Sequence, residues 1–108
     1  MNYKITTVPK FDKQAKRLSK KYISLKQELQ NLFTLLETEP IQGTSIGKNC
    51  YKIRLPIASK GKGKSGGARV ITHVYVLETT VYLLAIYDKA EQENIQPEEI
   101  NNLLSSIK

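Results

Sequence analysis

The sequence predicts a single α+β domain over residues 1–108, with the element order β-α-α-β-β-β-α. The predicted sheet has four mostly antiparallel strands, and a helical hairpin packs on one face of it. Apolar residues support this class, because they recur at helical spacing near both ends of the chain and alternate at strand spacing between them. The length also supports it, since 108 residues, of which 40% are hydrophobic, supply one modest core but not two.

The first half of the chain predicts a strand and two helices. Residues 2–8 mix β-branched and aromatic residues and form the strand. Residues 10–22 place apolar side chains on one helical face, namely Phe11, Ala15, Leu18 and Tyr22. Ser24 and Gln27 have the spacing of a capping box that opens a second helix, which Pro40 ends. Because only a short segment joins the helices, they are expected to form an antiparallel hairpin.

The second half predicts three strands and a final helix. After a loop at residues 43–48, residues 49–57 and residues 67–77 alternate between two faces. Residues 81–88 are apolar on both faces, which is typical of a central strand that is covered on both sides. Short connections make these strands an antiparallel meander. Pro97 fits the first turn of the last helix.

The charge distribution predicts a polyanionic partner. The net charge is +7, and residues 48–74 hold seven basic residues and no acidic residue. Such a segment attracts phosphate-rich molecules. Residues 1–22 are also strongly basic, but there a solubilising helix surface explains the charge equally well. Asp88 and Glu93, near the last strand, are expected to orient basic groups or to be solvated.

The cysteine and histidine counts exclude several kinds of site. Cys50 and His73 are the only residues of their types, which rules out an internal disulfide, a Cys-based or multi-His metal centre and a His-pair nuclease. Cys50 is interpreted as a packing residue. No apolar run approaches the roughly 20 residues of a membrane helix, and no signal peptide is visible. Together with the lone cysteine, this favours a cytoplasmic protein that has no membrane partner.

Strand parity predicts a cluster of basic side chains on one sheet face. Lys52 and Arg54 alternate with core residues, and Arg69 and His73 share a parity on the next strand. If the apolar positions point to the core, all four side chains lie on the opposite face, where no carboxylate is expected. An anion stabilises such a cluster, and a phosphodiester fits it. The alternative is a set of solvated side chains on an open sheet face.

A glycine- and lysine-rich loop at residues 58–66 extends this charge. Gly63-Lys64-Ser65 looks like the end of a P-loop, but Ala58 stands where that motif needs glycine, and a strand follows instead of a helix. We therefore reject nucleoside triphosphate binding. The predicted RNA contacts are His73 and four lysines in or near this loop, namely Lys48, Lys60, Lys62 and Lys64.

Three segments together resemble the RelE/HigB toxin family, most closely the HigB-like branch that has a Gly-rich loop. They are residues 50–55 (CYKIRL), residues 65–71 (SGGARVI) and residues 84–89 (LAIYDK). The resemblance covers most of the chain and implies the fold described above. It also implies an endoribonuclease that enters the ribosomal A site, contacts ribosomal RNA and cuts mRNA without metal or cofactor. A cognate antitoxin protein that binds and silences the toxin is implied as well.

The resemblance further implies a catalytic set, namely Lys52, Arg54, Arg69, Tyr87 and Lys89. The first two match the family's basic strand pair, and Arg69 matches the arginine that clamps the scissile phosphate. Lys89 matches a further basic residue after the last strand. Ile95 stands where some members have a functional tyrosine, and Tyr87 is the natural substitute.

Metal-free RNA cleavage explains why these residue types are needed. The 2′-hydroxyl attacks the neighbouring phosphate, so the site requires a base, cations for the developing charge and an acid for the leaving 5′-oxygen. The two arginines stay charged and act as clamps. Lys52 is the candidate base because nearby cations disfavour its charged form, and His73 is the alternative base. Either Tyr87 or Lys89 acts as the acid.

Two other functions remain open at this point. A ParE-like toxin of the same superfamily would poison DNA gyrase, although that branch typically lacks a complete basic cluster. A non-enzymatic RNA-binding module would bind RNA with a steep salt dependence and never cut it. The module hypothesis has little aromatic support, because only Tyr75 clearly shares the basic face for base stacking.

Overall fold

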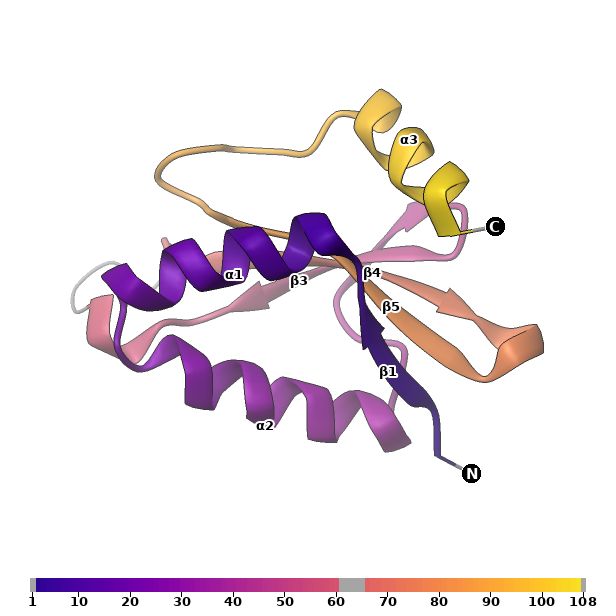
Figure 1. The fold of residues 1–108 in the computed structure, drawn as a ribbon, viewed down its shortest axis with the longest axis horizontal. Coiled ribbons are helices and arrows are strands. Elements are labelled where there is room, and N and C mark those ends of the chain that lie inside the picture. Colours follow the sequence, from indigo (N-terminus) through magenta and orange to yellow (C-terminus); the bar gives the residue numbers. More distant parts are fainter. Residues whose placement is uncertain (1, 61–65, 108) are drawn as a thin grey trace.

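The computed structural model describes residues 2–60 and 66–107 and confirms the predicted α+β class, with a fifth strand added (Figure 1). The elements in chain order are β1 (Lys4–Thr7), α1 (Pro9–Lys21), α2 (Leu25–Thr38), β2 (Thr44–Gly47), β3 (Cys50–Leu55), the short 3₁₀ turn η1 (Ala58–Lys60), β4 (Ala68–Tyr75), the 3₁₀ turn η2 (Val76–Glu78), β5 (Thr80–Asp88) and α3 (Pro97–Ile107). Among the described residues, no helix has the length and apolar character needed to cross a membrane.

The five strands form one mixed sheet in the order β1-β5-β4-β3-β2. β3, β4 and β5 form the predicted antiparallel meander. β2 pairs antiparallel with β3, and β1 runs parallel to β5. β5 lies inside the sheet between β1 and β4, and its residues are buried except for the half-buried Tyr82. The segment predicted as a loop at residues 43–48 instead contains β2, which pairs with β3 along the outer edge.

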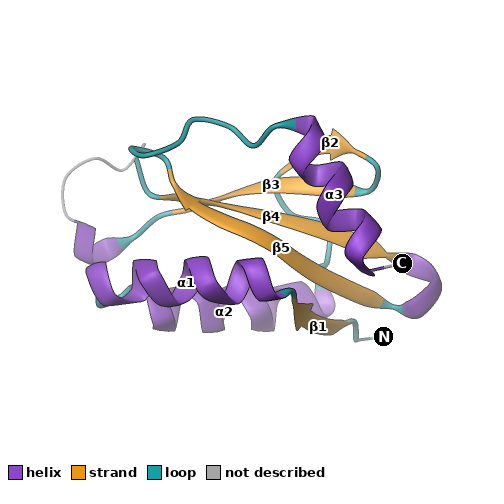
Figure 2. Cartoon of the chain, turned by 45° about the horizontal axis from the view of Figure 1, so that its top comes forward, coloured by secondary structure: helices purple, strands orange, loops and turns teal. Residues whose placement is uncertain are grey.

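The helical hairpin covers one face of the sheet, as Figure 2 shows. The core on this side joins buried leucines of both helices to a row of strand residues, in which Ile53 pairs with Val70 and Val70 with Ile86. α1 also lies along the part of β5 beyond its pairing with β1, since the Ile86 amide donates to Oε1 of Gln14 at 3.0 Å. A side chain of the helix thereby satisfies part of an open sheet edge.

The predicted capping box at the start of α2 is wrong. Ser24 precedes the helix, but its side chain makes no cap hydrogen bond to the backbone. Its hydroxyl instead bonds to Oε1 of Glu28 at 3.1 Å and to the hydroxyl of Ser59 at 2.8 Å. Gln27 donates to Asn31 on the helix surface. Ser59 lies in the η1 turn, so the hydroxyl of Ser24 holds this turn against the hairpin instead of capping the helix.

The last helix lies on the other face of the sheet (Figures 1 and 2). α3 and the helical hairpin therefore cover opposite faces of the sheet. Lys52 of β3 donates to Asn94 at 3.3 Å, and Lys48 donates to Asn101. An ion pair between Lys10 and Glu99 ties α3 to the start of α1. The polar segment from residue 89 to residue 96 thus returns across the face that carries the predicted cations.

Candidate active site

Strand register brings the predicted cations to one face of the sheet. Arg54 pairs with Arg69, and Arg69 pairs with Tyr87, across three neighbouring strands. Residues directly opposite each other in antiparallel strands point to the same face. Lys52 lies two residues before Arg54 and therefore shares this face, while Lys89 follows directly after β5.

Four of the predicted residues line one cleft of about 290 Å³ on this face. They are Lys52, Arg54, Arg69 and Lys89, and the remaining lining residues are Thr44, Glu93 and Asn94. Basic groups on β3, on β4 and just after β5 thus surround one space. Side chains of this kind can bind a phosphodiester from several directions at once, because arginine presents a planar fork and lysine a mobile point charge.

The cations differ in how firmly they are held. Arg69 is only 5% exposed, and its Nη1 donates to the carbonyls of Gly66 at 3.1 Å and Ala68 at 3.2 Å. Arg54 is exposed and Lys52 half-buried. Arg69 is therefore a fixed charge at the floor of the cleft, whereas Arg54 is free to adjust to a ligand.

The prediction that no carboxylate shares the basic face is wrong. Glu93 lines the cleft, and its Oε1 lies 4.0 Å from Nζ of Lys89. The side chain of Glu93 is 81% exposed, so its charge is largely screened by water. One exposed carboxylate faces four basic side chains in this cleft, and the local excess of positive charge remains. Sequence parity missed Glu93 and Asn94 because both come from an irregular segment, to which no strand pattern applies.

Tyr87 lies beside Arg69 but is not among the residues that line the cleft. Its side chain is buried, with 3% of the residue exposed. Burial raises the pKa of its hydroxyl above the ordinary value, and the charge of Arg69 partly opposes this shift. Among the described residues, this hydroxyl has no hydrogen-bond partner. The Tyr87 hydroxyl is therefore a protonated donor beside Arg69 that donates to no group among the described residues.

Asp88 anchors the turn that carries Lys89 to the cleft. It is fully buried, accepts a hydrogen bond from the Tyr22 hydroxyl at 2.7 Å, and accepts another from the Ala90 amide at 2.9 Å. The Lys89 amide donates to the carbonyl of Gly67 at 3.1 Å. Of the two roles open to it, solvation is therefore excluded for Asp88. Its contacts fix the backbone of this turn from inside the core.

A surface ion pair holds the same turn from outside. Arg17 of α1 donates to Glu91 at 2.8 Å, and Nζ of Lys21 lies 3.7 Å from the other carboxylate oxygen of Glu91. The hydrogen bond from Arg17 lowers the pKa of the Glu91 carboxyl. Glu91 thus neutralises part of the basic charge of α1, and no sequence pattern predicts this contact.

His73 is placed in the interior and does not fit its predicted role as an RNA contact. It is 1% exposed, and its ring lies between those of Tyr75 and Tyr82, with centroid distances of 6.2 Å and 6.4 Å. Its Nδ1 is 3.6 Å from Sγ of Cys50, which is itself fully buried. Parity assigns His73 to the correct face, but its ring is buried beside Tyr75 and Tyr82 and is not exposed to a ligand.

The predicted loop contacts lie outside the cleft or outside the described residues. Lys48 is exposed and donates to Asn101 of α3, at some remove from Arg54 and Arg69. The side chains of Lys60, Lys62 and Lys64 are not part of the described structure. Within residues 2–60 and 66–107, no three His, Cys, Asp or Glu side chains come together in an arrangement that could hold a metal ion.

Comparison with known proteins agrees with this fold. A family model described as the RelE toxin of the RelE/RelB toxin–antitoxin system matches residues 10–107. A double mutant of the E. coli toxin RelE in the free state is similar over 100% of both chains, at 19% identity and a TM-score of 0.58. The intact E. coli RelBE toxin–antitoxin complex matches over 78% of this chain and 93% of that chain, at 21% identity and a TM-score of 0.56. The toxin–antitoxin complex RelBE2 from Mycobacterium tuberculosis matches over 83% and 94%, at 16% identity and a TM-score of 0.60.

Proposed function

Because the chain belongs to the RelE family of toxins of toxin–antitoxin systems, we propose that it is a ribosome-dependent endoribonuclease that cuts mRNA in the ribosomal A site. The observation that carries this proposal is the cleft of about 290 Å³ in which Lys52, Arg54, Arg69 and Lys89 converge. A phosphodiester that enters this cleft meets cations from β3, from β4 and from the turn just after β5. Cutting an mRNA while it is being translated stops protein synthesis, and this would make the protein toxic to the cell.

The proposed reaction needs no metal or cofactor. The 2′-oxygen of the nucleotide attacks the adjacent phosphorus, the bond from phosphorus to the 5′-oxygen breaks, and the products end in a 2′,3′-cyclic phosphate and a 5′-hydroxyl. Arg54 and Arg69 stabilise the charge that develops on the phosphate, because guanidinium groups remain protonated throughout. A fixed cation such as Arg69 needs little reorganisation during the reaction, and this favours the transition state.

Proton transfer is assigned to the remaining members of the set. Lys52 is the proposed base, and its Nζ is held 3.3 Å from Asn94 and shares the cleft with other cations. The acid that protonates the leaving 5′-oxygen is Tyr87 or Lys89. Tyr87 is supported by its buried, protonated hydroxyl, and Lys89 is supported by its direct place in the cleft.

The proposal is tested by in vitro translation with purified protein, followed by mapping of mRNA 5′ ends with and without ribosomes. We expect new 5′ ends only when ribosomes are present. Arg54→Ala should reduce cutting by roughly 10²- to 10³-fold, the usual effect of removing one charge-stabilising donor. Arg54 is exposed, so this variant leaves the core untouched. Arg69→Ala should have at least as large an effect, with folding checked by circular dichroism because Arg69 is buried.

The matched control is Lys26→Ala, which removes an exposed cation from α2 on the opposite side of the sheet. It should cut mRNA normally. Normal potency of Arg54→Ala and Arg69→Ala would refute the assignment of the cleft. DNA damage with intact mRNA would instead support a gyrase poison, and RNA binding without any cutting would support a non-enzymatic module.

We also propose a cognate antitoxin as the protein partner. The solved RelBE complexes contain toxin and antitoxin together, and the positive cleft of this chain suits a partner segment rich in Asp and Glu. Co-expression of the toxin with its cognate antitoxin should restore translation. If it does, a complex of the two proteins should be recovered whose stability falls as salt concentration rises.

A further inference from the structure

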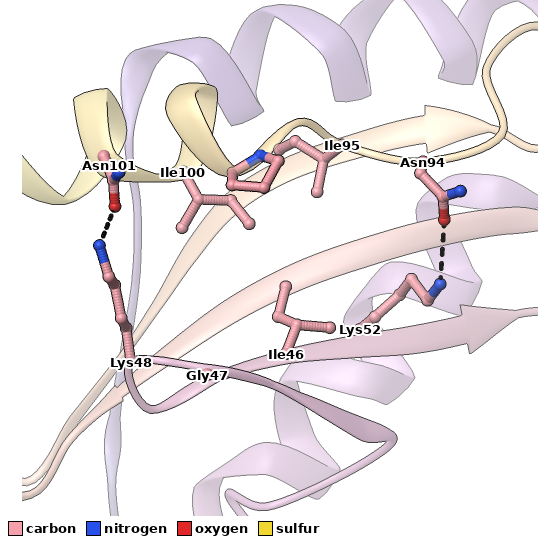
Figure 3. A pocket seen from close by; sticks show the side chains of 9 residues that line it. Ile46, Gly47, Lys48, Lys52, Asn94, Ile95, Ile100 and Asn101 are labelled. Carbon is pink, nitrogen blue, oxygen red and sulfur yellow. Dashed lines mark hydrogen bonds between the residues drawn. The ribbon is translucent and has the colours of Figure 1, made fainter.

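A second cavity adjoins the cleft and differs from it in chemistry. This pocket has a volume of about 320 Å³ and lies between the β2–β3 hairpin and the start of α3 (Figure 3). Its walls are mainly apolar and include Ile46 from β2, Ile95 from the preceding loop and Ile100 from α3. We call it the side pocket. Its size is at the lower end of the range of small-molecule sites, roughly 300–1,000 Å³.

The side pocket adjoins the cleft and shares two lining residues with it. Lys52 and Asn94 line both spaces, and a hydrogen bond of 3.3 Å joins them. Figure 3 shows this bond at one end of the pocket and the bond between Lys48 and Asn101 at the other end. A ligand bound in the cleft therefore has an apolar space beside it, with an amide group at each end.

We propose that the side pocket holds one unpaired nucleobase of the RNA whose adjoining phosphate occupies the cleft. A nucleobase is flat and apolar on its faces, which suits contact with three isoleucine side chains. Its edges carry hydrogen-bond donors and acceptors, and an asparagine amide offers both. The proposal rests on the proposed function, because it takes the phosphate in the cleft as its starting point.

Ligand binding in the side pocket has a consequence for sequence preference. Asn94 and Asn101 would exchange their present lysine partners for the edge of the base, and bases that present different donor and acceptor patterns would bind unequally. The cleft alone grips only the sugar–phosphate backbone, which is the same at every position. The side pocket is therefore the part of this molecule that would select where the RNA is cut.

The first test is NMR titration of the intact protein with isoleucine methyl groups labelled. The probes are the four nucleoside 5′-monophosphates, and ribose 5-phosphate serves as the control that has the phosphate but no base. We expect all five probes to perturb the arginine side-chain signals of Arg54 and Arg69. Only the monophosphates that carry a base should perturb the methyl signals of Ile46, Ile95 and Ile100.

The outcomes separate this proposal from the function on which it rests. If the arginine signals respond but the three isoleucine signals stay unchanged with every monophosphate, the side pocket proposal is overturned and the phosphate cleft stands. If neither set responds to any probe, both proposals fail. Equal perturbation of the isoleucine signals by ribose 5-phosphate would also overturn the side pocket proposal, because it would show that the base is not what the pocket detects.

The second test fills the pocket. Ile46→Phe places a larger side chain in it, and Ile41→Phe makes the same change at an exposed loop position outside it. Ile46→Phe should weaken nucleoside monophosphate binding about tenfold, the scale expected for losing the contacts of one base, and leave ribose 5-phosphate binding unchanged. In the translation assay, the same variant should alter the base composition at the cut sites. Unchanged affinity and unchanged cut sites in Ile46→Phe would overturn the proposal.

Discussion

At the scale of single residues, Tyr87 and Arg69 show how the site combines burial with polar chemistry. Both side chains are almost fully buried, and they face each other across β4 and β5. The guanidinium of Arg69 donates to backbone carbonyls, whereas the hydroxyl of Tyr87 finds no partner among the described residues. A buried polar group without a partner costs stability, and such groups in native proteins are often functional.

Tyr87→Phe is therefore expected to stabilise the folded protein and to reduce its mRNA cutting. Removing the unpartnered hydroxyl should raise the free energy of unfolding by about 1 kcal/mol, measured by urea denaturation. If Tyr87 is the acid, mRNA cutting should fall by roughly a hundredfold or more. Full cutting activity in Tyr87→Phe would reject Tyr87 as the acid, and Lys89→Met would then be expected to abolish cutting.

The pH dependence of stability gives an independent readout of Tyr87. Its pKa is raised in the folded protein above the ordinary value of about 10, which the unfolded chain regains. Below about pH 10, the Tyr87 hydroxyl is protonated in both the folded and the unfolded protein, and its full contribution to the free energy of unfolding is present. As pH rises above about 10, the unfolded state loses its proton first, so the free energy of unfolding falls. Tyr87→Phe should show a shallower alkaline decline than the wild type. Tyr82, whose pKa is also raised, is present in both proteins and contributes equally to both. If the wild type and Tyr87→Phe lost stability equally with rising pH, the raised pKa of Tyr87 would be contradicted.

At the scale of elements, the β2–β3 hairpin builds one wall of the cleft. Thr44 of β2 pairs with Lys52 of β3, and both line the cleft. Gly43 precedes this pair with φ of +84°, and a β-carbon there would collide with the carbonyl of Lys52. Gly47 at the other end of β2 has a similar φ of +90°, but a β-carbon there would meet open space. A side chain at either glycine would strain the backbone, but only at Gly43 would it also collide with a neighbouring strand.

Alanine substitutions at these glycines form a matched pair. Gly47→Ala should lower the free energy of unfolding by about 1–2 kcal/mol, because the only cost is that of holding alanine in a left-handed backbone conformation. Gly43→Ala adds a collision with backbone that cannot rotate away, and a loss of about 3 kcal/mol or more is expected. Gly43→Ala should also reduce mRNA cutting, since it displaces Lys52. Equal losses of stability, measured by urea denaturation, would show that the hairpin relaxes freely.

The elements also show what sequence patterns can and cannot predict. Strand parity placed Lys52, Arg54 and Arg69 on one face because alternation is fixed by the backbone itself. β2 was missed because its four residues have no clear pattern and become a strand only by pairing with β3. Glu93 was missed for a related reason: an irregular segment has no periodicity, and its path over the sheet is set by tertiary contacts. The catalytic roles, and the HigB-like branch within the family, stay predictions.

At the scale of the whole molecule, the layers leave one basic region open to large ligands. The helical hairpin covers one face of the sheet, and α3 lies over part of the other (Figure 2). The cleft lies beside the segment that joins β5 to α3, because Lys89, Glu93 and Asn94 of that segment line it. The net charge of +7 strengthens attraction to RNA at long range. The cations that line the cleft should account for much of the salt dependence of binding.

This division of charge is measurable with short unstructured RNA. Each cation that neutralises a phosphate contributes about −0.7 to the slope of log affinity against log salt concentration for single strands. Lys52→Ala should therefore reduce the magnitude of the slope by about 0.7. Lys26→Ala, an equal loss of charge on α2, should leave the slope nearly unchanged. Equal effects of the two variants, measured by fluorescence anisotropy, would show that binding is spread over the whole surface.

The parallel pairing of Lys4–Thr7 with Thr80–Leu83 bears on the chain during its own synthesis. The first strand leaves the exit tunnel early but has no partner until β5 follows it. Lys89, the last of the convergent cations, emerges later still. Under the proposed function, the nascent polypeptide is harmless to the ribosome that makes it for most of elongation. The strand order thus delays assembly of the cleft until most of the chain has been made, without any need for an inhibitor.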